Sequence, residues 1–248
     1  MPSRCCIVIP TYNERENISA LLPRVLRLSE SITGEWRLYI LIVDDNSPDD
    51  TSGIVRRFMR ENKGRIFLLE RRRRCGLGSA YKDGFKYAME KLKADVIVEM
   101  DGDLSHNPSD IPRLLKALSD GSDLAIGSRY IAGGSIEGWS WKRKLISMIG
   151  NGLPRLLLKL NISDCTSGFR AIRTDLLSSI MDEIDADGYA FQIDMIYHAV
   201  TEGARISEVP IYFKNRKAGK SKLRLKDILE FIWVLLKLRF KGRTRHKL

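Results

Sequence analysis

The sequence contains few cysteines, and their spacing fits neither a disulfide framework nor a zinc site. There are four in 248 residues. None forms a C-x-x-C pair, and none is spaced with histidine in the way that a metal site needs. Cys5 and Cys6 lie in a short apolar run that reads as buried. We therefore expect reduced thiols in a cytosolic environment rather than a disulfide framework.

Long apolar runs are also absent. No stretch reaches the roughly 18 apolar residues that a membrane-spanning helix requires, so we expect no such helix. The N-terminus leads directly into an expected strand, and we expect no signal peptide. We find no internal repeat and no low-complexity segment. The length of 248 residues suits one large domain, or a domain with appendages.

Negative charge is in deficit, and the deficit is local. The net charge is +11, and the pI is about 9.6. Between Lys214 and Leu248 there are 13 Lys and Arg but two acids, an excess equal to the whole net charge. A basic chain favours an anionic partner: nucleic acid, an anionic membrane or a phosphorylated substrate. The basic residues stand beside apolar helices without an interleaved aromatic platform, so we expect no nucleic acid; a non-catalytic basic binding protein remains the alternative of another class.

Apolar strands alternate with helical patterns through the first half of the chain. The expected strands are continuous rather than alternating in hydrophobicity, and helices are expected between them. This pattern predicts an α/β fold with a mostly parallel, Rossmann-like sheet covered by helices on both faces. The strands that we expect are Cys5–Ile9, Leu38–Val43, Arg65–Leu69, the run from Val96, Asp123–Tyr130 and Ile206–Phe213.

Two carboxylates end the run that begins at Val96. Asp101 and Asp103 are separated by Gly102. On an extended chain, residues i and i+2 point the same way, so we expect both side chains to face one site. Close carboxylates repel unless a cation is present, and Mg²⁺ or Mn²⁺ binds one or two carboxylates together with substrate phosphates. The alternative is a solvated turn at the end of a strand.

The chain changes character after Gly134. Residues 139–160 mix apolar and basic residues, with Pro154 breaking the run, and resemble one or two amphipathic helices on a membrane surface. The tail from Leu223 to Phe240 has the same composition. The alternatives are an ordinary surface helix for the first stretch and a core helix for the second. The basic, glycine-containing loop Asn215–Lys222 suits a lid over a bound donor.

Eight motifs, taken in their order and spacing, resemble the polyprenyl-phosphate mannose synthases of the dolichyl-phosphate type, within the inverting glycosyltransferase family 2. They are Pro10–Glu14, Asp44–Thr51, Asp101–His106, Gly127–Gly134, Trp141–Ser147, Asp164–Arg170, Gly188–Met195 and Glu208–Leu223. The resemblance implies a GT-A catalytic domain over residues 1–225, followed by a basic amphipathic helix and tail over residues 226–248. It implies inverting transfer of mannose from GDP-mannose to dolichyl or polyprenyl phosphate. The same reaction with UDP-glucose or another UDP-sugar is the alternative.

The resemblance also implies roles for individual residues. Asp103 and Arg216 are expected to be catalytic, and Asp101, Asp103 and Ser105 to hold Mg²⁺ or Mn²⁺. Arg129, Arg143 and Ser147 are expected at the lipid phosphate. Residues expected to bind the nucleotide sugar are Pro10, Tyr12, Glu14, Val43, Asp44, Asp45, Asp101, Gly102, Asp103, Arg216 and Lys222.

For some other residues, the sequence leaves two possible roles open. Gln192 and Asp194 resemble the sugar- and acceptor-side wall. Capping of the following helix is the alternative role for Asp44 and Asp45. The four arginines Arg71–Arg74 read as a solvated loop, with contact to anionic lipid or nucleotide as the other interpretation.

The implied chemistry fits the small number of histidines, of which there are three. A phosphate acceptor is already anionic and needs little general-base help. The departing diphosphate does need help, which a metal and nearby cations supply. We expect peripheral attachment to the cytosolic face of a membrane, the endoplasmic reticulum in a eukaryote or the plasma membrane in a prokaryote. A small membrane-anchoring subunit is a further candidate partner.

Overall fold

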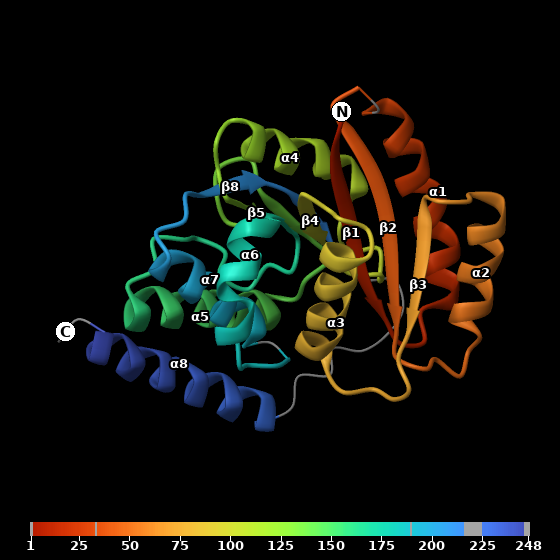
Figure 1. The fold of residues 1–248 in the computed structure, drawn as a ribbon. Helices are drawn as coiled ribbons and strands as arrows, with labels where there is room; N and C mark the ends of the chain where they lie inside the picture. The colour runs from red at the N-terminus through yellow and green to blue at the C-terminus, as the bar shows by residue number, and fades with distance from the viewer. Residues whose placement is uncertain (1, 33, 189, 216–224, 246–248) are drawn as a thin grey trace.

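The computed structural model describes residues 2–32, 34–188, 190–215 and 225–245. A seven-stranded sheet runs through its centre (Figure 1), in the order β3-β2-β1-β4-β7-β5-β8. All neighbours in it are parallel except β7, which is antiparallel to both β4 and β5. Its strands are β1 (Ser3–Thr11), β2 (Trp36–Asp44), β3 (Ile66–Glu70), β4 (Val96–Glu99), β5 (Leu124–Ser128), β7 (Arg170–Arg173) and β8 (Ile206–Pro210).

Helices cover both faces of this sheet, because its strands are apolar on both sides. Cys5, Ile7 and Ile9 of β1 pack with the helices of one face, whereas Cys6 and Val8 pack with those of the other. The first face carries α1 (Arg15–Ser31), α2 (Thr51–Glu61) and α4 (Ile111–Ser119). The second carries α3 (Leu77–Glu90), α6 (Thr174–Ile180) and α7 (Phe191–Thr201), with short 3₁₀ turns at Pro108–Asp110 and Met181–Glu183. The expected α/β sheet with helices on both faces is confirmed.

Two further helices lie outside this layer. Helix α5 (Trp141–Leu158) contacts α8 (Leu225–Arg245), which also contacts α7. Figure 1 shows α8 at the edge of the molecule, beside the α5 and α7 side. Leu235 reaches the main core, and Val234 and Leu238 pack on Ala186 and Ala190. Among the residues described, no helix is long and apolar enough to cross a bilayer.

The carboxyl ends of β1, β2 and β4 meet at one edge of the sheet. Thr11 at the end of β1 is paired with Asp44 at the end of β2. Asp101 follows β4, which pairs with β1 on its other side. Ligands of open α/β sheets gather at this edge. Since β7 is antiparallel, the residues before Arg170 reach the same edge from the opposite direction.

Three expectations about local structure are wrong. The motif that ends at Arg170 leads directly into β7, a strand that we did not expect. The expected strand Ile206–Phe213 is two strands, because Ile211 separates β8 from β9 (Tyr212–Lys214), which pairs in a second small sheet with β6 (Ser135–Glu137). Pro154 does not break its helix: Leu153, Leu157 and Leu158 pack against the core on both sides of it, so α5 continues through.

Candidate functional site

Asp44 ties together the turns that follow β1 and β2. It is 1% exposed. Its Oδ1 accepts hydrogen bonds from the hydroxyls of Thr11 (2.9 Å) and Ser47 (2.6 Å), and its Oδ2 accepts the N–H of Ser47 (2.9 Å). The hydroxyl of Ser47 in turn accepts the N–H of Asn13, which has a positive φ of 59°. Both carboxylate oxygens of Asp44 are therefore used to shape the pocket wall.

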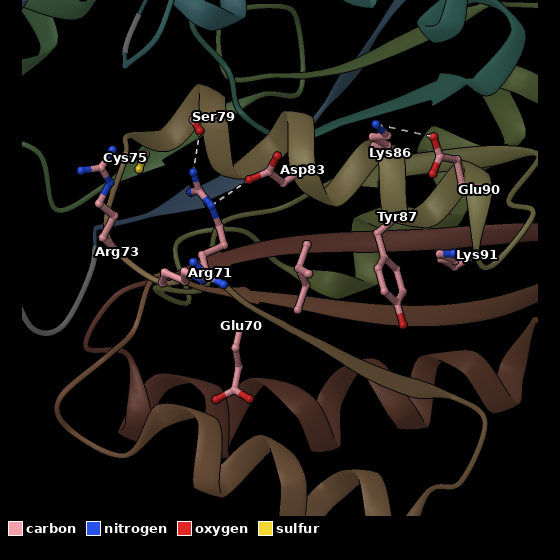
Figure 2. A pocket seen from close by; sticks show the side chains of 12 residues that line it. Glu70, Arg71, Arg73, Cys75, Ser79, Asp83, Lys86, Tyr87, Glu90 and Lys91 are labelled. Carbon is pink, nitrogen blue, oxygen red and sulfur yellow. Dashed lines mark hydrogen bonds and ion pairs between the residues drawn. The ribbon is translucent and has the colours of Figure 1, made fainter.

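Asp45 is held by a buried arginine. Its Oδ1 accepts Nη1 of Arg71 at 2.7 Å, and each of the two side chains is 8% exposed. Nε of Arg71 lies 2.9 Å from Oδ2 of Asp83, and Nη2 donates to the hydroxyl of Ser79. Figure 2 shows Arg71 directed toward Ser79 and Asp83 of α3. Burial raises the pKa of Asp45 above its usual range, although Arg71 and Arg74 oppose that rise.

The four arginines Arg71–Arg74 therefore differ in their burial and contacts. The solvated-loop expectation is wrong for Arg71 and correct for Arg72 and Arg73, which are exposed. The guanidinium of Arg74 lies 4.7 Å from the centre of the Tyr12 ring. A hollow of about 590 Å³ runs beside this segment and α3 (Figure 2). Two of the four arginines thus contact residues that the sequence assigns to the nucleotide.

Asp101 and Asp103 lie in a turn, not on an extended chain as we expected. Leu104 has a positive φ of 64°, which turns the chain back. The N–H of Asp101 donates to Nδ1 of His106 at 3.1 Å, and Oδ1 of Asp103 accepts the N–H of Ser105 at 3.0 Å. The Asp101 side chain is 38% exposed. The turn still gathers two carboxylates at the edge of the sheet where β1, β2 and β4 end.

These oxygen donors fit a hard divalent cation that is completed by donor phosphates. Over the residues described, no three His, Cys, Asp or Glu side chains gather to hold a metal by themselves. Ser105 is 3% exposed, and its carbonyl accepts the N–H of Lys214. Its role as a third ligand stays a prediction.

His106 is unsuited to act as a base. Its ring stacks on Phe169 (4.9 Å between centres) and meets Phe213 edge-on (5.4 Å). Burial lowers its pKa to about 4, and the nearby Arg129 adds to this while Asp103 opposes it. Its Nδ1 accepts an N–H from the backbone of Asp101, so the ring is neutral there.

Buried polar groups lie beneath this turn. Arg170, which is 0% exposed, donates to the carbonyls of Ser167, Gln192 and Cys165. Burial raises the pKa of Glu99 to about 7, although Arg170 and Gln192 lower it. A Cβ on Gly168 would lie 3.6 Å from Nε2 of Gln192 and 3.7 Å from Oδ1 of Asp101. Gln192 is thus beside the carboxylate turn.

Asp194, expected beside Gln192, has a different task. It is 2% exposed, and its Oδ2 accepts the N–H groups of Asp185 and Ala186, both at 2.8 Å. Its Oδ1 lies 3.3 Å from Nε2 of His198 on the same helix. Asp194 therefore fixes the loop before α7, where α8 packs, and the expectation that it lines the sugar is not supported by its contacts.

The three residues expected at the lipid phosphate come together. Arg129 forms two bonds with Asp164, Nε to Oδ2 and Nη2 to Oδ1, each 2.7 Å. Burial by itself would lower the pKa of Arg129, but the bonds with Asp164 outweigh it and raise that pKa. Tyr130 donates its hydroxyl to Ser147 at 2.8 Å, and Nη1 of Arg143 donates to Oδ1 of Asn215 at 2.8 Å.

Arg216 and Lys222 lie outside the described residues. Sequence reasoning missed Asp164 as the partner of Arg129, Arg71 as the partner of Asp45, and Trp139 between Arg129 and Arg143. Asp164 stands in a motif that we noted, but its partner is 35 residues away. Trp139 stands in a tryptophan-rich stretch that we read as a membrane surface.

Comparisons with known proteins identify relatives of the chain. The sequence profile described as "Glycosyl transferase family 2" matches residues 6–181. A protein of Mycolicibacterium smegmatis named "Polyprenol monophosphomannose synthase" is 39% identical over 241 residues, 97% of this chain and 88% of the relative. A protein of Micrococcus luteus named "Undecaprenyl-phosphate mannosyltransferase" is 42% identical over 221 residues, 89% of this chain and 87% of the relative.

A solved structure shares the fold. Glucosyl-3-phosphoglycerate synthase of Mycobacterium tuberculosis, crystallised with Mn²⁺, UDP and phosphoglyceric acid, superimposes with a TM-score of 0.68 at 21% identity. The match covers 96% of this chain and 78% of that one. At this identity the likeness concerns the fold, and it confirms the expected GT-A-like α/β architecture.

Proposed function

The chain belongs to glycosyl transferase family 2, and from this premise we propose that it transfers mannose from GDP-mannose to a polyprenyl or dolichyl phosphate with inversion. The observation that carries the proposal is the proximity of two sites of opposite charge. Asp101 and Asp103 form a turn at the sheet edge, and Phe213 links it to Arg129: its ring meets His106 of that turn and lies 5.3 Å from the Arg129 guanidinium. The names of the two relatives support the sugar and the lipid acceptor.

We assign the donor to the edge where β1 and β2 end. Asp45, fixed by Arg71, is the group offered to the nucleoside, and Tyr12 lies under Arg74 beside it. Asp44 shapes this wall, and so do the buried Val43 and the half-buried Pro10 and Glu14 around it. Arg216 and Lys222 are proposed to reach the donor diphosphate, and their chemistry as cations suits that task.

Mg²⁺ or Mn²⁺ held by Asp101 and Asp103, with Ser105 as a third candidate ligand, would stabilise the charge that grows on the departing GDP. Gly102, between the two aspartates, is buried in this turn. Asp103 is the proposed catalytic carboxylate, with Arg216 as its cationic counterpart.

The acceptor phosphate is assigned to Arg129, Arg143 and Ser147. A phosphate oxygen attacks C1 of mannose from the side opposite to the diphosphate, the bond from C1 to the GDP oxygen breaks, and inversion follows. The attacking oxygen is already deprotonated near neutral pH, so the neutral His106 is not needed as a base. Arg143, whose partner Asn215 is uncharged, supplies positive charge to the phosphate, and Arg129, held by Asp164, orients its oxygens.

Peripheral attachment to an anionic membrane is part of the proposal. Helices α5 and α8 contact one another, and both expose apolar side chains outward. Trp141 is 70% exposed and Trp233 is 61% exposed, and Lys142 and Lys237 lie over their rings. Exposed tryptophans beside lysines suit the headgroup level of a bilayer. The most exposed of the other apolar residues are Leu145, Ile146, Met148, Ile149, Leu156, Leu229 and Phe240.

This surface would bring the phosphate of a membrane-embedded polyprenol to the site. We place the protein at the cytosolic face, the endoplasmic reticulum in a eukaryote or the plasma membrane in a prokaryote, where nucleotide sugars are supplied. A small membrane-anchoring subunit could share the same surface.

Sugar transfer to a defined lipid tests the proposal. Purified protein, dolichyl phosphate and Mn²⁺ are given labelled GDP-mannose in one tube and labelled UDP-glucose in another, in detergent or vesicles. We expect label in the lipid phase from GDP-mannose only. Label from UDP-glucose alone would change the donor and keep the reaction. Label from neither, with native membranes also added, would refute the proposed transfer.

A further inference from the structure

Trp139 is shared by two arginines. It lies between β6 and the start of α5. The guanidinium carbon of Arg143 is 4.2 Å from the centre of its ring, and that of Arg129 is 5.4 Å away. Tryptophan is the strongest cation–π partner among the aromatic side chains. The indole therefore contacts both cations expected at the lipid phosphate.

Each guanidinium is also fixed from another direction. Asp164 receives Arg129 in two parallel bonds, and Thr166 accepts a third. Asn215 accepts Nη1 of Arg143 at 2.8 Å. Asn215 is uncharged, so this bond orients Arg143 without cancelling its charge. The two arginines come from different parts of the chain, and the indole contacts both of them.

The indole is in turn fixed to the carboxylate turn by a series of rings. Trp139 meets Phe213 edge-on at 5.4 Å, and Phe213 meets His106 edge-on at 5.4 Å. Nδ1 of His106 accepts the N–H of Asp101 at 3.1 Å. Rigid packing of this kind preserves the distance between two reacting groups, and small displacements lower the rate steeply.

The indole N–H of Trp139 makes no hydrogen bond over the described residues, whereas its ring face contacts two arginines. Nε1 of Trp139 is buried and, over the part of the chain that the structure describes, has no hydrogen-bond partner. Burying a donor without a partner is unfavourable, and Phe or Leu would avoid it. Over the described residues, the indole therefore contacts the arginines through its ring face and makes no hydrogen bond through its N–H.

We propose that Trp139 is a positioning residue for the acceptor phosphate: its ring sets the separation and direction of Arg129 and Arg143 so that both meet one phosphate group. This inference rests on the proposed function, because the phosphate belongs to the polyprenyl acceptor. Two guanidiniums repel one another when brought to one site. The ring and Asp164 offset that repulsion before the phosphate arrives.

Three variants test the inference. Trp139→Leu removes the ring, and Trp139→Phe keeps a weaker ring without the N–H. Trp36→Phe is the matched control, since it takes an indole from the core at the start of β2, the end of that strand away from the site. The acceptor is farnesyl phosphate in detergent, so that attachment to a bilayer does not enter. Acceptor KM, donor KM and kcat are measured, with farnesyl phosphate binding followed separately by calorimetry.

We expect Trp139→Leu to raise the acceptor KM and Kd about 10-fold or more, and Trp139→Phe about 2–5-fold, with donor KM within about 2-fold. Trp36→Phe should leave all three constants unchanged. In a double-mutant cycle, Arg143→Met should have a smaller effect in the Trp139→Leu background than in the wild type.

Wild-type acceptor constants in Trp139→Leu, equal losses for donor and acceptor, or additive effects with Arg143→Met would overturn the inference. A wild-type protein that binds farnesyl phosphate but transfers no mannose would refute the proposed function alone, and Trp139→Leu binding would still decide the role of the ring. If the wild type neither transfers nor binds, both are wrong.

Discussion

Asp164 and Arg129 form a buried, two-pronged ion pair, with both bonds 2.7 Å long and the Asp164 side chain 0% exposed. The pair joins the end of β5 to the loop before β7. It holds Arg129, one cation of the proposed acceptor site, in a fixed position. Removing one partner of such a pair leaves a buried charge alone, which is far more destabilising than never having had the pair.

Asp164→Asn is therefore expected to lower the free energy of unfolding by about 3–5 kcal/mol. Urea denaturation measures this. Asp120→Asn is the control, because its partner Lys116 and Asp120 itself are 73% and 61% exposed. An exposed pair contributes about 0–1 kcal/mol. Equal losses in the two variants would contradict the buried-pair argument.

Asp103→Ala should abolish measurable transfer, a loss of at least about 10²–10³-fold, because a group that stabilises developing charge is removed. Asp103→Asn is the companion variant. Its amide oxygen still accepts the N–H of Ser105, so the turn should be kept while the charge is lost. Label transfer and thermal unfolding are measured together. Full activity in Asp103→Ala would end the metal role.

Gly102→Ala should be tolerated. A Cβ there would lie 3.4 Å from the side chains of Ile18 and Ile9 and 3.5 Å from Thr11, which is ordinary contact. We expect activity within about 2-fold and stability within about 1 kcal/mol, with a gain more expected than a loss. Gly134→Ala is the contrast, since its Cβ would be 2.7 Å from the carbonyl oxygen of Ser128. A strongly destabilised Gly102→Ala protein would show that the turn is tighter than described.

Arg71→Met should make both stability and donor binding depend on pH. Burial already raises the pKa of Asp45, with Asp44 adding to the rise and Arg71 and Arg74 opposing it. Without Arg71 the pKa rises further. Asp45 then protonates at a higher pH than in the wild type, so donor KM should increase as the pH falls from neutral.

The stability of Arg71→Met should depend on pH in the opposite direction to its donor binding: binding worsens as the pH falls, whereas stability worsens as the pH rises. A folded-state pKa above the unfolded value gives stability that is present at low pH and is lost as pH rises through the folded pKa. The deficit of Arg71→Met relative to the wild type should accordingly be largest near neutral pH and shrink as pH falls. Arg72→Met, which removes an exposed neighbouring cation, should show neither trend. A deficit that does not change with pH would exclude Asp45 as its source.

Trp141→Ser combined with Trp233→Ser should weaken binding to anionic vesicles at least about 10-fold, because each buried aromatic contributes about 1.5–3 kcal/mol. Vesicle flotation measures the bound fraction. Val200→Ser removes a residue that is 43% exposed on α7 and serves as the control. Unchanged flotation in the double variant would remove α5 and α8 from the membrane surface.

The sequence predicts those parts of the fold that have local causes. The strands β1, β2 and β4 are recognisable in the sequence as continuous apolar runs, because both of their faces are buried. The carboxylates after β4 are recognisable because a parallel sheet places its sites there. Strand β7 escaped prediction because it is four residues long with arginine at both ends, and its pairing with β4 and β5 is purely long-range.

The side-chain partners were harder to predict for the same reason. Four consecutive arginines give no indication that Arg71 is the one that is buried, because that depends on α3 packing beside β2. Trp139 has the composition of a membrane-surface residue, and only the return of β9 beside β6 brings Phe213 against it. Such roles depend on residues that are distant in the chain.

The reversed strand β7 has a consequence for synthesis of the protein. Strand β5 has no direct pairing with β4; β7 stands between them. A nascent chain that ends before Arg170 can form the four strands β3, β2, β1 and β4, while β5 has no strand to pair with until β7 is complete, about 45 residues later. At a translation rate of roughly 5–20 residues per second, that interval lasts several seconds, during which the unpaired edges of β4 and β5 expose the growing chain to aggregation.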